Sequence, residues 1–291
     1  MKEFEVTTDN VGMRADVFVA ANYPQFTRSS LERLFDKDMV SVNGTPIKPS
    51  HKIKDGEKLT VDEELIRRQP ESIDLPIIYE DDDVMVIDKP AGVLTHSKGA
   101  LNEEATVASF IKTKLKDESL NGNRAGIVHR LDRATSGVII TGKTASAVKH
   151  LQKQFSQRRT KKLYLAVVEG VPDEAEAIID APILRNPRKP QTFIVDGEGK
   201  SAVTHYKVIK PFKNGQKMCC LLELRPQTGR THQLRVHMAY IGHPIVGDTV
   251  YGHGDGPMML HAKSLELTLP NKERRVFESG TPKRIKEFAG I

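Results

Sequence analysis

The sequence predicts an α+β fold in which a small α+β unit precedes a larger domain with a mixed, mainly antiparallel sheet and flanking helices. Two observations lead to this prediction. Short alternating apolar runs outnumber helical patterns and follow one another in meander-like order, with helices interspersed. A polar segment that contains Pro70 separates a short leading part from the rest. We therefore expect a domain at 1–65, a linker at 66–75 and a domain at 76–291 that ends in a basic tail.

The leading part has the pattern of two helices followed by short strands. Thr27 offers an N-cap to the second helix, whose apolar residues fall on one face. Asn43-Gly44 is a strong signal for a hairpin turn. The expected elements are helices at 16–21 and 28–37 and strands at 40–42 and 58–61. Such a compact pattern buries few positions.

The larger part alternates strands and helices. An acidic turn at 81–83 joins its first two strands, and Thr144 offers an N-cap to its middle helix. Expected strands lie at 77–80, 84–87, 137–140, 163–168, 203–209 and 218–224, and expected helices at 105–115, 145–157 and 231–241. The sequence contains no internal repeat and no low-complexity segment.

Composition excludes several protein classes. The 291 residues carry a net charge of +6, and no stretch approaches the ~18 uncharged apolar residues of a membrane helix. The first residues lack the apolar run of a signal peptide. Cys219 and Cys220 are adjacent, so on a strand they point to opposite faces and are not expected to pair or to share a metal. We expect a reducing, cytoplasmic compartment and no membrane partner.

Positive charge is concentrated in one part of the chain. Residues 121–170 carry 10 basic and 2 acidic side chains, a net charge of +8 that exceeds the total of the chain. Residues 71–120 have a net charge of −6, and residues 1–70 are nearly neutral at −1. A surface that binds a polyanion is therefore expected within 121–170. Its basic run at 157–162 fits contact with a nucleic-acid backbone, or else a solvated helix end.

The first segment that could carry chemistry is 128–137. It places Asp132 between Arg130 and Arg133, in a loop between apolar strands. Neighbouring cations favour the ionised carboxylate, which can act as a nucleophile or as a base. A loop salt bridge is the alternative interpretation, and the residue types alone do not separate the two.

The second segment, 225–237, concentrates arginine and histidine around a Gly-Arg-Thr sequence. If a helix begins at Thr231, the free N–H groups of its first turn suit a phosphate. Arg235 then lies on the same face as Thr231, beside His232. The alternative is an ordinary helix with solvated arginines.

The third segment, 161–170, is an alternating strand on which Tyr164 shares a face with Lys162 and Ala166. A packed strand residue is the alternative to a tyrosine that contacts substrate. The histidines of the chain do not have zinc spacings, and the sequence contains no Walker A or dinucleotide fingerprint. No metal site and no cofactor are expected.

These segments resemble motifs of the RluA/RluD-type pseudouridine synthases, which isomerise uridine in RNA. The resemblance runs from about residue 75 to residue 270 and keeps three separated motifs in the family's order. The matching stretches are HRLDRATSGVII at 129–140, KKLYLAVVEG at 161–170 and RPQTGRTHQLRVH at 225–237, with DKPAGVLTH at 88–96, GHPIVGDTVYG at 242–252 and MLHA at 259–262. The resemblance implies an isomerase that acts on RNA and needs no cofactor.

The resemblance also implies roles for the residues at motif positions. Asp132 matches the essential aspartate, which attacks the ribose or removes a sugar proton, and the sequence leaves both routes open. Arg235 matches the arginine that pairs with this aspartate, and Tyr164 the tyrosine that packs against the target base. Arg130 matches a residue that fills the space of the flipped-out base. Further residues of these motifs expected to bind substrate are His129, Arg133 and Leu234.

Residues 13–61 resemble the ribosomal-protein-S-four type of RNA-binding module, which is commonly fused ahead of synthases of this kind. The nearly neutral charge of this part departs from a basic RNA-binding domain, although its cations can still form one face. Leu269-Pro270 departs from the larger pattern, because relatives often have His-Pro there. The residues expected to contact RNA are Arg28, Arg33, Lys149, Lys153, Arg158, Arg159, Lys161 and Lys162.

Synthases of the resembled family that have this two-domain layout often act on large-subunit rRNA, so the resemblance implies that substrate, with tRNA as the alternative. We expect a monomer. Two other functions remain open. A non-catalytic RNA-binding or ribosome-assembly factor could keep the same fold, and an isomerisation assay distinguishes it. A hydrolase of glycosidic bonds usually needs two acidic residues at one site, and the motifs supply only Asp132.

Overall fold

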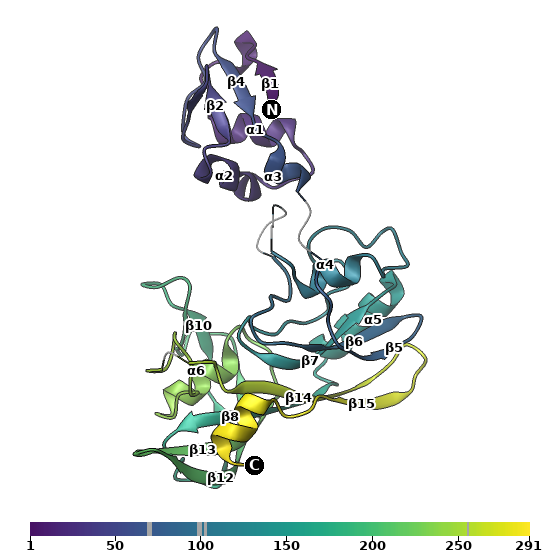
Figure 1. The fold of residues 1–291 in the computed structure, drawn as a ribbon, viewed down its shortest axis with the longest axis vertical. Coiled ribbons are helices and arrows are strands. Elements are labelled where there is room, and N and C mark those ends of the chain that lie inside the picture. The colour runs from purple at the N-terminus through teal and green to yellow at the C-terminus, as the bar shows by residue number, and fades with distance from the viewer. Residues whose placement is uncertain (69–71, 98–100, 102–103, 255) are drawn as a thin grey trace. The chain divides into compact units, whose positions relative to one another are not determined.

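The computed structural model describes residues 1–68, 72–97, 101, 104–254 and 256–291, which form two compact units (Figure 1). The smaller unit comprises 1–73, 96–110 and 121–125, and the larger comprises 74–95, 111–120 and 126–291. The smaller unit thus includes chain from beyond residue 76 in addition to the expected 1–65. The expected linker at 66–75 lies partly outside the described residues, because 69–71 are not described.

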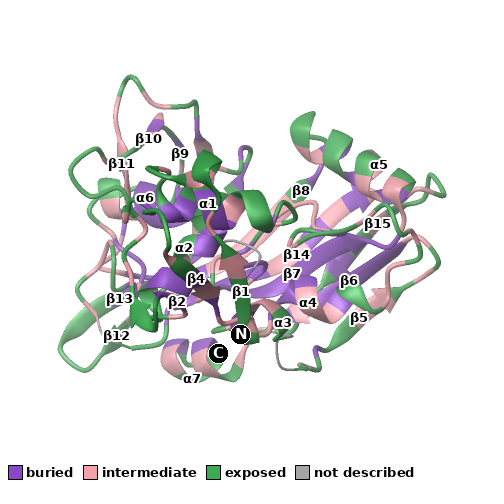
Figure 2. Ribbon diagram, turned by 90° about the horizontal axis from the view of Figure 1, so that it is seen from above, coloured by how far each residue is buried: buried purple, intermediate pink, exposed green. Residues whose placement is uncertain are grey.

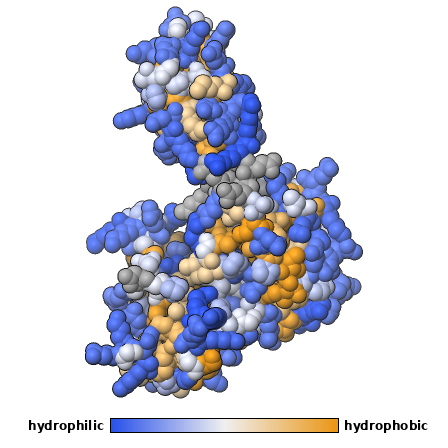
Figure 3. Space-filling view, in the orientation of Figure 1, coloured by the Kyte–Doolittle hydropathy of each residue, from blue (hydrophilic) through white to orange (hydrophobic). Residues whose placement is uncertain are grey.

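The smaller unit packs helices and a four-stranded antiparallel sheet around one apolar core. Thr27 caps the second helix as predicted, and its side chain accepts a hydrogen bond from the Ser30 N–H. The surface of this unit is mostly hydrophilic on the face drawn in Figure 3. In sheet order the strands are β1 (Lys2–Glu5), β4 (Lys58–Val61), β2 (Val40–Val42) and β3 (Thr45–Pro46), and the helices are η1 (Thr8–Asn10), α1 (Ala15–Asn22), α2 (Arg28–Asp36) and α3 (Glu64–Arg67).

The larger unit is built on a nine-stranded mixed sheet in the order β5-β6-β7-β14-β8-β13-β12-β9, with β15 paired to β14. Among the described strands of this sheet, β14 and β7 pair in parallel and the other pairs are antiparallel. The strands are β5 (Ile77–Glu80), β6 (Val84–Lys89), β7 (Ser136–Gly142), β8 (Lys161–Glu169), β9 (Glu176–Asp180), β12 (Val203–Asn214), β13 (Lys217–Pro226), β14 (Leu260–Thr268) and β15 (Arg274–Glu278). The predicted fold class is confirmed.

The middle of this sheet is buried, as Figure 2 shows for β6, β7 and β14. All seven residues of β7 are buried, and α5 (Ala145–Ser156) packs onto them. Gly137, at φ +113°, is needed at the start of β7, because a Cβ there would lie 2.1 Å from the carbonyl oxygen of Ala262. The close approach of β14 fixes the end of the loop that carries Asp132.

Three expectations about local structure are wrong. The basic C-terminal tail is instead β15 followed by α7 (Lys283–Ala289), because Ile285 and Ala289 are buried in an apolar cluster with residues of β8 and β13. The expected helices at 105–115 and 231–241 are shorter, since they form α4 (Val107–Lys112) and α6 (Gln233–Tyr240). The sequence patterns also miss β9, β14, β15 and the hairpin of β10 (Ile183–Arg185) and β11 (Phe193–Val195).

Candidate active site

A pocket of about 520 Å³ in the larger unit brings the three sequence motifs together. The loop before β7 contributes Asp132, strand β8 contributes Tyr164, and α6 contributes Arg235. The pocket lies where the buried centre of the sheet meets the turn into α6, so strands and a helix hold its walls. The geometry therefore joins residues that lie about a hundred positions apart in the chain, such as Asp132 and Arg235.

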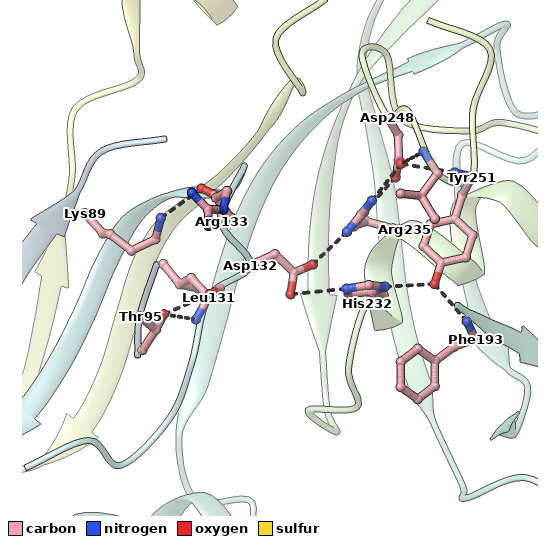
Figure 4. Close-up of polar contacts among 11 residues, drawn as sticks. Lys89, Thr95, Leu131, Asp132, Arg133, Phe193, His232, Arg235, Asp248 and Tyr251 are labelled. Atoms are coloured by element: carbon pink, nitrogen blue, oxygen red, sulfur yellow. Dashed lines mark hydrogen bonds and ion pairs between the residues drawn. The ribbon is translucent and has the colours of Figure 1, made fainter. Parts of the chain in front are cut away.

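Arg235 connects two carboxylates (Figure 4). Its Nη1 donates to Oδ2 of Asp132 at 3.2 Å. Its Nε and Nη2 donate to the two carboxylate oxygens of Asp248 at 2.7 and 2.8 Å. Arg235 is only 7% exposed, and Asp248 is 1% exposed. The predicted pairing of Arg235 with Asp132 is present, and Asp248 is a partner that the sequence analysis missed.

Tyr164 lies on β8 and lines the same pocket as Asp132. Burial raises the pKa of the Tyr164 hydroxyl, and the negative charge of Asp132 raises it further. The phenol therefore stays protonated near neutral pH. It can donate a hydrogen bond and offer the face of its ring, but it is not a phenolate base.

Two residues that the sequence analysis missed hold the loop on either side of Asp132. Thr95 Oγ1 donates to the carbonyl of Leu131 at 2.8 Å and accepts from the Leu131 N–H at 3.1 Å. The buried Lys89 Nζ donates to the carbonyl of Arg133 at 3.2 Å and to two carbonyls of its own segment. Burial lowers the pKa of Lys89 to about 7, against the attraction of Asp132. The residues flanking Asp132 are thus held by the last residue of β6 and by the segment that follows it.

The other predicted substrate residues have different positions. Arg130 is exposed at the pocket, and Leu234 lines it while largely buried. His129 also lines the pocket, but its Nε2 accepts from the Ile140 N–H and its ring stacks on Phe155, and burial lowers its pKa to about 3. Arg133 is not among the residues that line the pocket, and its side chain donates to the Gly92 carbonyl. His129 is therefore a neutral wall residue.

Several cations predicted to contact RNA already have protein partners. In the smaller unit Arg28 pairs with Asp16, and Arg33 donates to the carbonyl of Leu101. In the larger unit Lys161 pairs with Glu266 at 3.2 Å. Lys162 donates to the Thr228 carbonyl, and burial lowers its pKa to about 8.

The remaining predicted cations lie on α5 and just after it. Lys149, Lys153, Arg158 and Arg159 are exposed. Of these four, Arg158 lines the pocket. This surface therefore adjoins the pocket that contains Asp132.

His232 and Tyr251 also belong to the site. The sequence places His232 beside Arg235 without giving it a role, and Tyr251 is not singled out. His232 Nε2 lies 3.9 Å from Oδ1 of Asp132, and its Nδ1 lies 2.8 Å from the Tyr251 hydroxyl. A usable signal existed, because 88–96 and 242–252 matched family motifs without an assigned role. These two stretches contain Lys89, Thr95 and Tyr251.

The described residues contain no group of three or more His, Cys, Asp or Glu side chains that could hold a metal ion. In the same part of the chain no helix is long and apolar enough to cross a membrane. Cys219 and Cys220 are free and buried in different apolar clusters, in agreement with their predicted opposite orientation on a strand. Burial raises the pKa of both thiols.

Known proteins are similar to this chain in both sequence and fold. The RNA pseudouridylate synthase family matches residues 83–240. The ribosomal large subunit pseudouridine synthase D of Borreliella burgdorferi is 38% identical over 301 residues, which cover 98% of this chain and 91% of that protein. The protein of the same name from Haemophilus ducreyi is 36% identical over 252 residues, covering 85% and 75%. The structure of human RNA pseudouridylate synthase domain containing 1 matches with a TM-score of 0.60 and 29% identity, covering 74% of this chain and 86% of that one.

The family match takes in more than half of the chain and includes Asp132, Tyr164 and Arg235. The relatives extend the similarity over nearly the whole length, including the segment with Asp248 and Tyr251. Sequence motifs, pocket geometry and relatives agree. The chain therefore belongs to the RNA pseudouridylate synthase family.

Proposed function

We propose that this chain isomerises specific uridines of large-subunit ribosomal RNA to pseudouridine, with Asp132 as the reacting carboxylate. The observation that carries the proposal is the pocket in which Asp132, paired with Arg235 at 3.2 Å, shares one space with Tyr164. Family membership supports the reaction. Relatives named ribosomal large subunit pseudouridine synthase D, which align with almost the entire chain, support the choice of RNA.

The reaction breaks the glycosidic N–C bond, turns the base and joins the sugar to a base carbon. Asp132 either attacks the ribose or removes a sugar proton, and each route needs the ionised carboxylate. The Arg235 guanidinium donates a charge-assisted hydrogen bond to the carboxylate and orients it. Because substrate and product are isomers, the reaction consumes no oxidant, reductant or energy source.

The target base enters the pocket by leaving its stack in the RNA. The Tyr164 ring stacks on the uracil, and its protonated hydroxyl can donate to a base oxygen. Arg130, exposed beside the pocket, fills the space that the base leaves. His129 and Leu234 form neutral walls, so the reacting carboxylate meets the sugar in a partly dry space.

The exposed cations of α5 and the segment after it grip RNA phosphates next to the pocket. Lys149, Lys153, Arg158 and Arg159 support this path, because they belong to the part of the chain with a net charge of +8. Lys162 contributes less than expected, because it is partly buried, whereas Lys161 is exposed and can contact a phosphate while it pairs with Glu266. The proposed contacts are sequence-independent and weaken with salt.

The smaller unit acts as an RNA-binding module of the ribosomal-protein-S-four type, and the protein works as a monomer. The pair of helices α1 and α2 and the four-stranded sheet support the first statement, as does the cap of α2 by Thr27. Arg28 lies at the start of α2, and its guanidinium is about half exposed while it pairs with Asp16. It can therefore contact a phosphate without losing its partner.

A strain that lacks this protein tests the proposal directly. Pseudouridines are mapped in its rRNA and tRNA, and the strain is then complemented with wild type or Asp132→Asn. We expect sites in large-subunit rRNA to disappear and to return with wild type alone. Purified Asp132→Asn is expected to bind the RNA fragment with unchanged affinity and release no tritium from uridine labelled at C5.

Three results contradict the proposal. Loss of pseudouridines from tRNA alone would identify tRNA, and not large-subunit rRNA, as the substrate. An unchanged map would favour a non-catalytic RNA-binding factor. Full tritium release by Asp132→Asn would show that another group performs the chemistry.

A further inference from the structure

His232 lies between the reacting aspartate and a tyrosine whose hydroxyl oxygen accepts a backbone hydrogen bond. The backbone N–H of Phe193 donates to the Tyr251 hydroxyl oxygen at 2.9 Å. That hydroxyl lies 2.8 Å from His232 Nδ1, and His232 Nε2 lies 3.9 Å from Oδ1 of Asp132 (Figure 4). The four groups thus form one line from the pocket to the backbone of β11.

These contacts indicate which ring nitrogen of His232 carries the proton. A backbone N–H can only donate, so the Tyr251 oxygen accepts from Phe193. The Tyr251 hydroxyl can then donate its hydrogen to Nδ1 of His232. With Tyr251 as the donor to Nδ1, neutral His232 carries its hydrogen on Nε2, the nitrogen that faces Asp132.

The backbone of His232 is held in a conformation that few residues adopt. Its φ of +56° lies in the left-handed region, at the N-cap of α6. The turn is fixed by Gln233, whose side-chain oxygen accepts from the Arg230 N–H and from the Thr228 hydroxyl. Strained positions of this kind persist where the surroundings over-determine them, and they concentrate at active sites.

We propose that His232 is a positioning residue that directs Nε2–H at Oδ1 of Asp132, while Arg235 binds Oδ2, so that the carboxylate is held in one orientation. The inference rests on the proposed function, in which Asp132 reacts. The distance of 3.9 Å exceeds that of a hydrogen bond, and such contacts between catalytic groups commonly shorten as the reacting complex forms. Tyr251 acts one step further back, because its hydroxyl selects the tautomer.

The surroundings keep His232 neutral. Burial lowers its pKa, and the guanidinium groups of Arg235 and Arg130 lower it further, against the carboxylates of Asp132 and Asp248. The Tyr251 hydroxyl, 2.8 Å from Nδ1, is a further titratable group that faces it. A neutral donor orients Asp132 without adding a second positive charge to the ion pair that its carboxylate already makes with Arg235.

Two substitutions separate this role from a purely structural one. Asn tolerates the left-handed conformation but places its amide near the position of Nδ1, out of reach of Asp132. Gln fits that conformation less well but places an N–H near the position of Nε2. If His232 has only a structural role, His232→Asn should retain more activity than His232→Gln. If His232 positions Asp132, His232→Gln should retain more activity than His232→Asn.

The experiment measures single-turnover tritium release from an rRNA fragment that contains the mapped uridine, with RNA affinity and Tm determined for the same full-length proteins. We expect His232→Asn to slow the rate constant about tenfold with unchanged Kd, and His232→Gln to keep most of the rate. In Tyr251→Phe the loss of the donor to Nδ1 raises the pKa of His232, so the acid limb of the pH–rate profile moves to higher pH. Tyr240→Phe, at the exposed end of α6, is the control.

Two outcomes overturn the inference while the proposed function stands. One is a wild-type rate for His232→Asn when Asp132→Asn is inactive. The other is a loss in both His232 variants that follows their Tm, with no shift of the pH profile in Tyr251→Phe. If wild type releases no tritium from any large-subunit fragment, the proposed function has failed, and the inference fails with it.

Discussion

The guanidinium of Arg235 donates hydrogen bonds to two carboxylates that have different roles. Asp248 receives two of its nitrogens, whereas Asp132 receives one at 3.2 Å. Burial raises the pKa of Asp248, but the hydrogen bonds and charge of Arg235 outweigh burial and hold that pKa below its ordinary value. Asp248 therefore fixes the direction of the guanidinium and neutralises part of its charge, and Asp132 meets a single oriented donor.

Asp248→Asn is expected to lower both stability and turnover. Asparagine keeps the size of the side chain but removes the charge that compensates the buried Arg235. Loss of one partner from a buried pair costs about 3–5 kcal/mol, so we expect a clear fall in Tm. We also expect a single-turnover rate about tenfold lower, because Arg235 can turn both nitrogens toward Asp132. Asp180→Asn, at the exposed end of β9, is the control, and equal Tm values for the two variants would contradict this account.

At the residue scale the residues alone predict what each motif contains, and only the family resemblance predicts that Arg235 meets Asp132. Asp132, Tyr164 and Arg235 are predicted from short segments with family motifs, and all three line one pocket. Asp248 and Tyr251 both lie in the matched stretch 242–252, but their roles are not predicted, because the residues of that stretch do not show that one contacts Arg235 and the other His232. Their roles depend on how the segment before β14 packs on the start of α6.

At the scale of elements the site depends on the segment that leaves β6 and the loop that enters β7. Thr95 satisfies both backbone groups of Leu131, and Lys89 binds the carbonyl of Arg133. Asp132 therefore lies between two residues whose backbone is fixed. The loop needs no helix or strand geometry of its own to aim the carboxylate.

Thr95→Val tests this support. Valine keeps the shape of threonine but leaves the buried N–H and C=O of Leu131 without their partner, at about 1–3 kcal/mol for each group. We expect a lower free energy of unfolding in urea and a lower single-turnover rate with unchanged RNA affinity. Thr95→Ser retains the hydroxyl and should recover most of both losses. Identical behaviour of the valine and serine variants would show that the hydroxyl has no part in holding the loop.

Elements with local signals were predicted, and elements that depend on distant partners were not. Thr27 and Thr144 mark the starts of α2 and α5 because each cap is made within three residues. β14 pairs in parallel with β7 and antiparallel with β8, an arrangement set by strands that lie far away in the sequence. α7 was taken for a tail because its seven residues carry several charges and only Ile285 and Ala289 are buried.

At the scale of the whole molecule, buried histidines make stability depend on pH. His261 is 1% exposed, its Nδ1 lies 2.9 Å from the Ser136 hydroxyl, and burial lowers its pKa to about 4. In the unfolded chain histidine takes up a proton near pH 6.5. Between these two values the unfolded state binds more protons than the folded state. The contribution of His261 is therefore complete above pH 6.5 and is lost as the pH falls toward 4.

His261→Asn is expected to flatten part of this dependence. Asparagine keeps a polar atom near Ser136 but does not titrate. Between pH 7 and pH 4 the wild type should lose up to about 3 kcal/mol more of its free energy of unfolding than the variant does. Urea unfolding at pH 7, 5.5 and 4.5 measures the difference between the two proteins. The contributions of the carboxylates to the pH dependence are the same in both and cancel in that difference. Parallel pH profiles for the two proteins would show that His261 takes up its proton in the folded state.

The charge of the molecule predicts where RNA lies, and salt dependence tests that prediction. Lys153 and Arg159 are exposed on and after α5, outside the residues that line the pocket. Each phosphate contact adds about 0.7–0.9 to the slope of log affinity against log salt, so K153A/R159A should reduce that slope by about 1.5. K213A/K217A removes two exposed charges from the β12–β13 hairpin and should leave the slope unchanged. Equal slopes for both double variants would place the RNA away from α5, even if Asp132 proves essential.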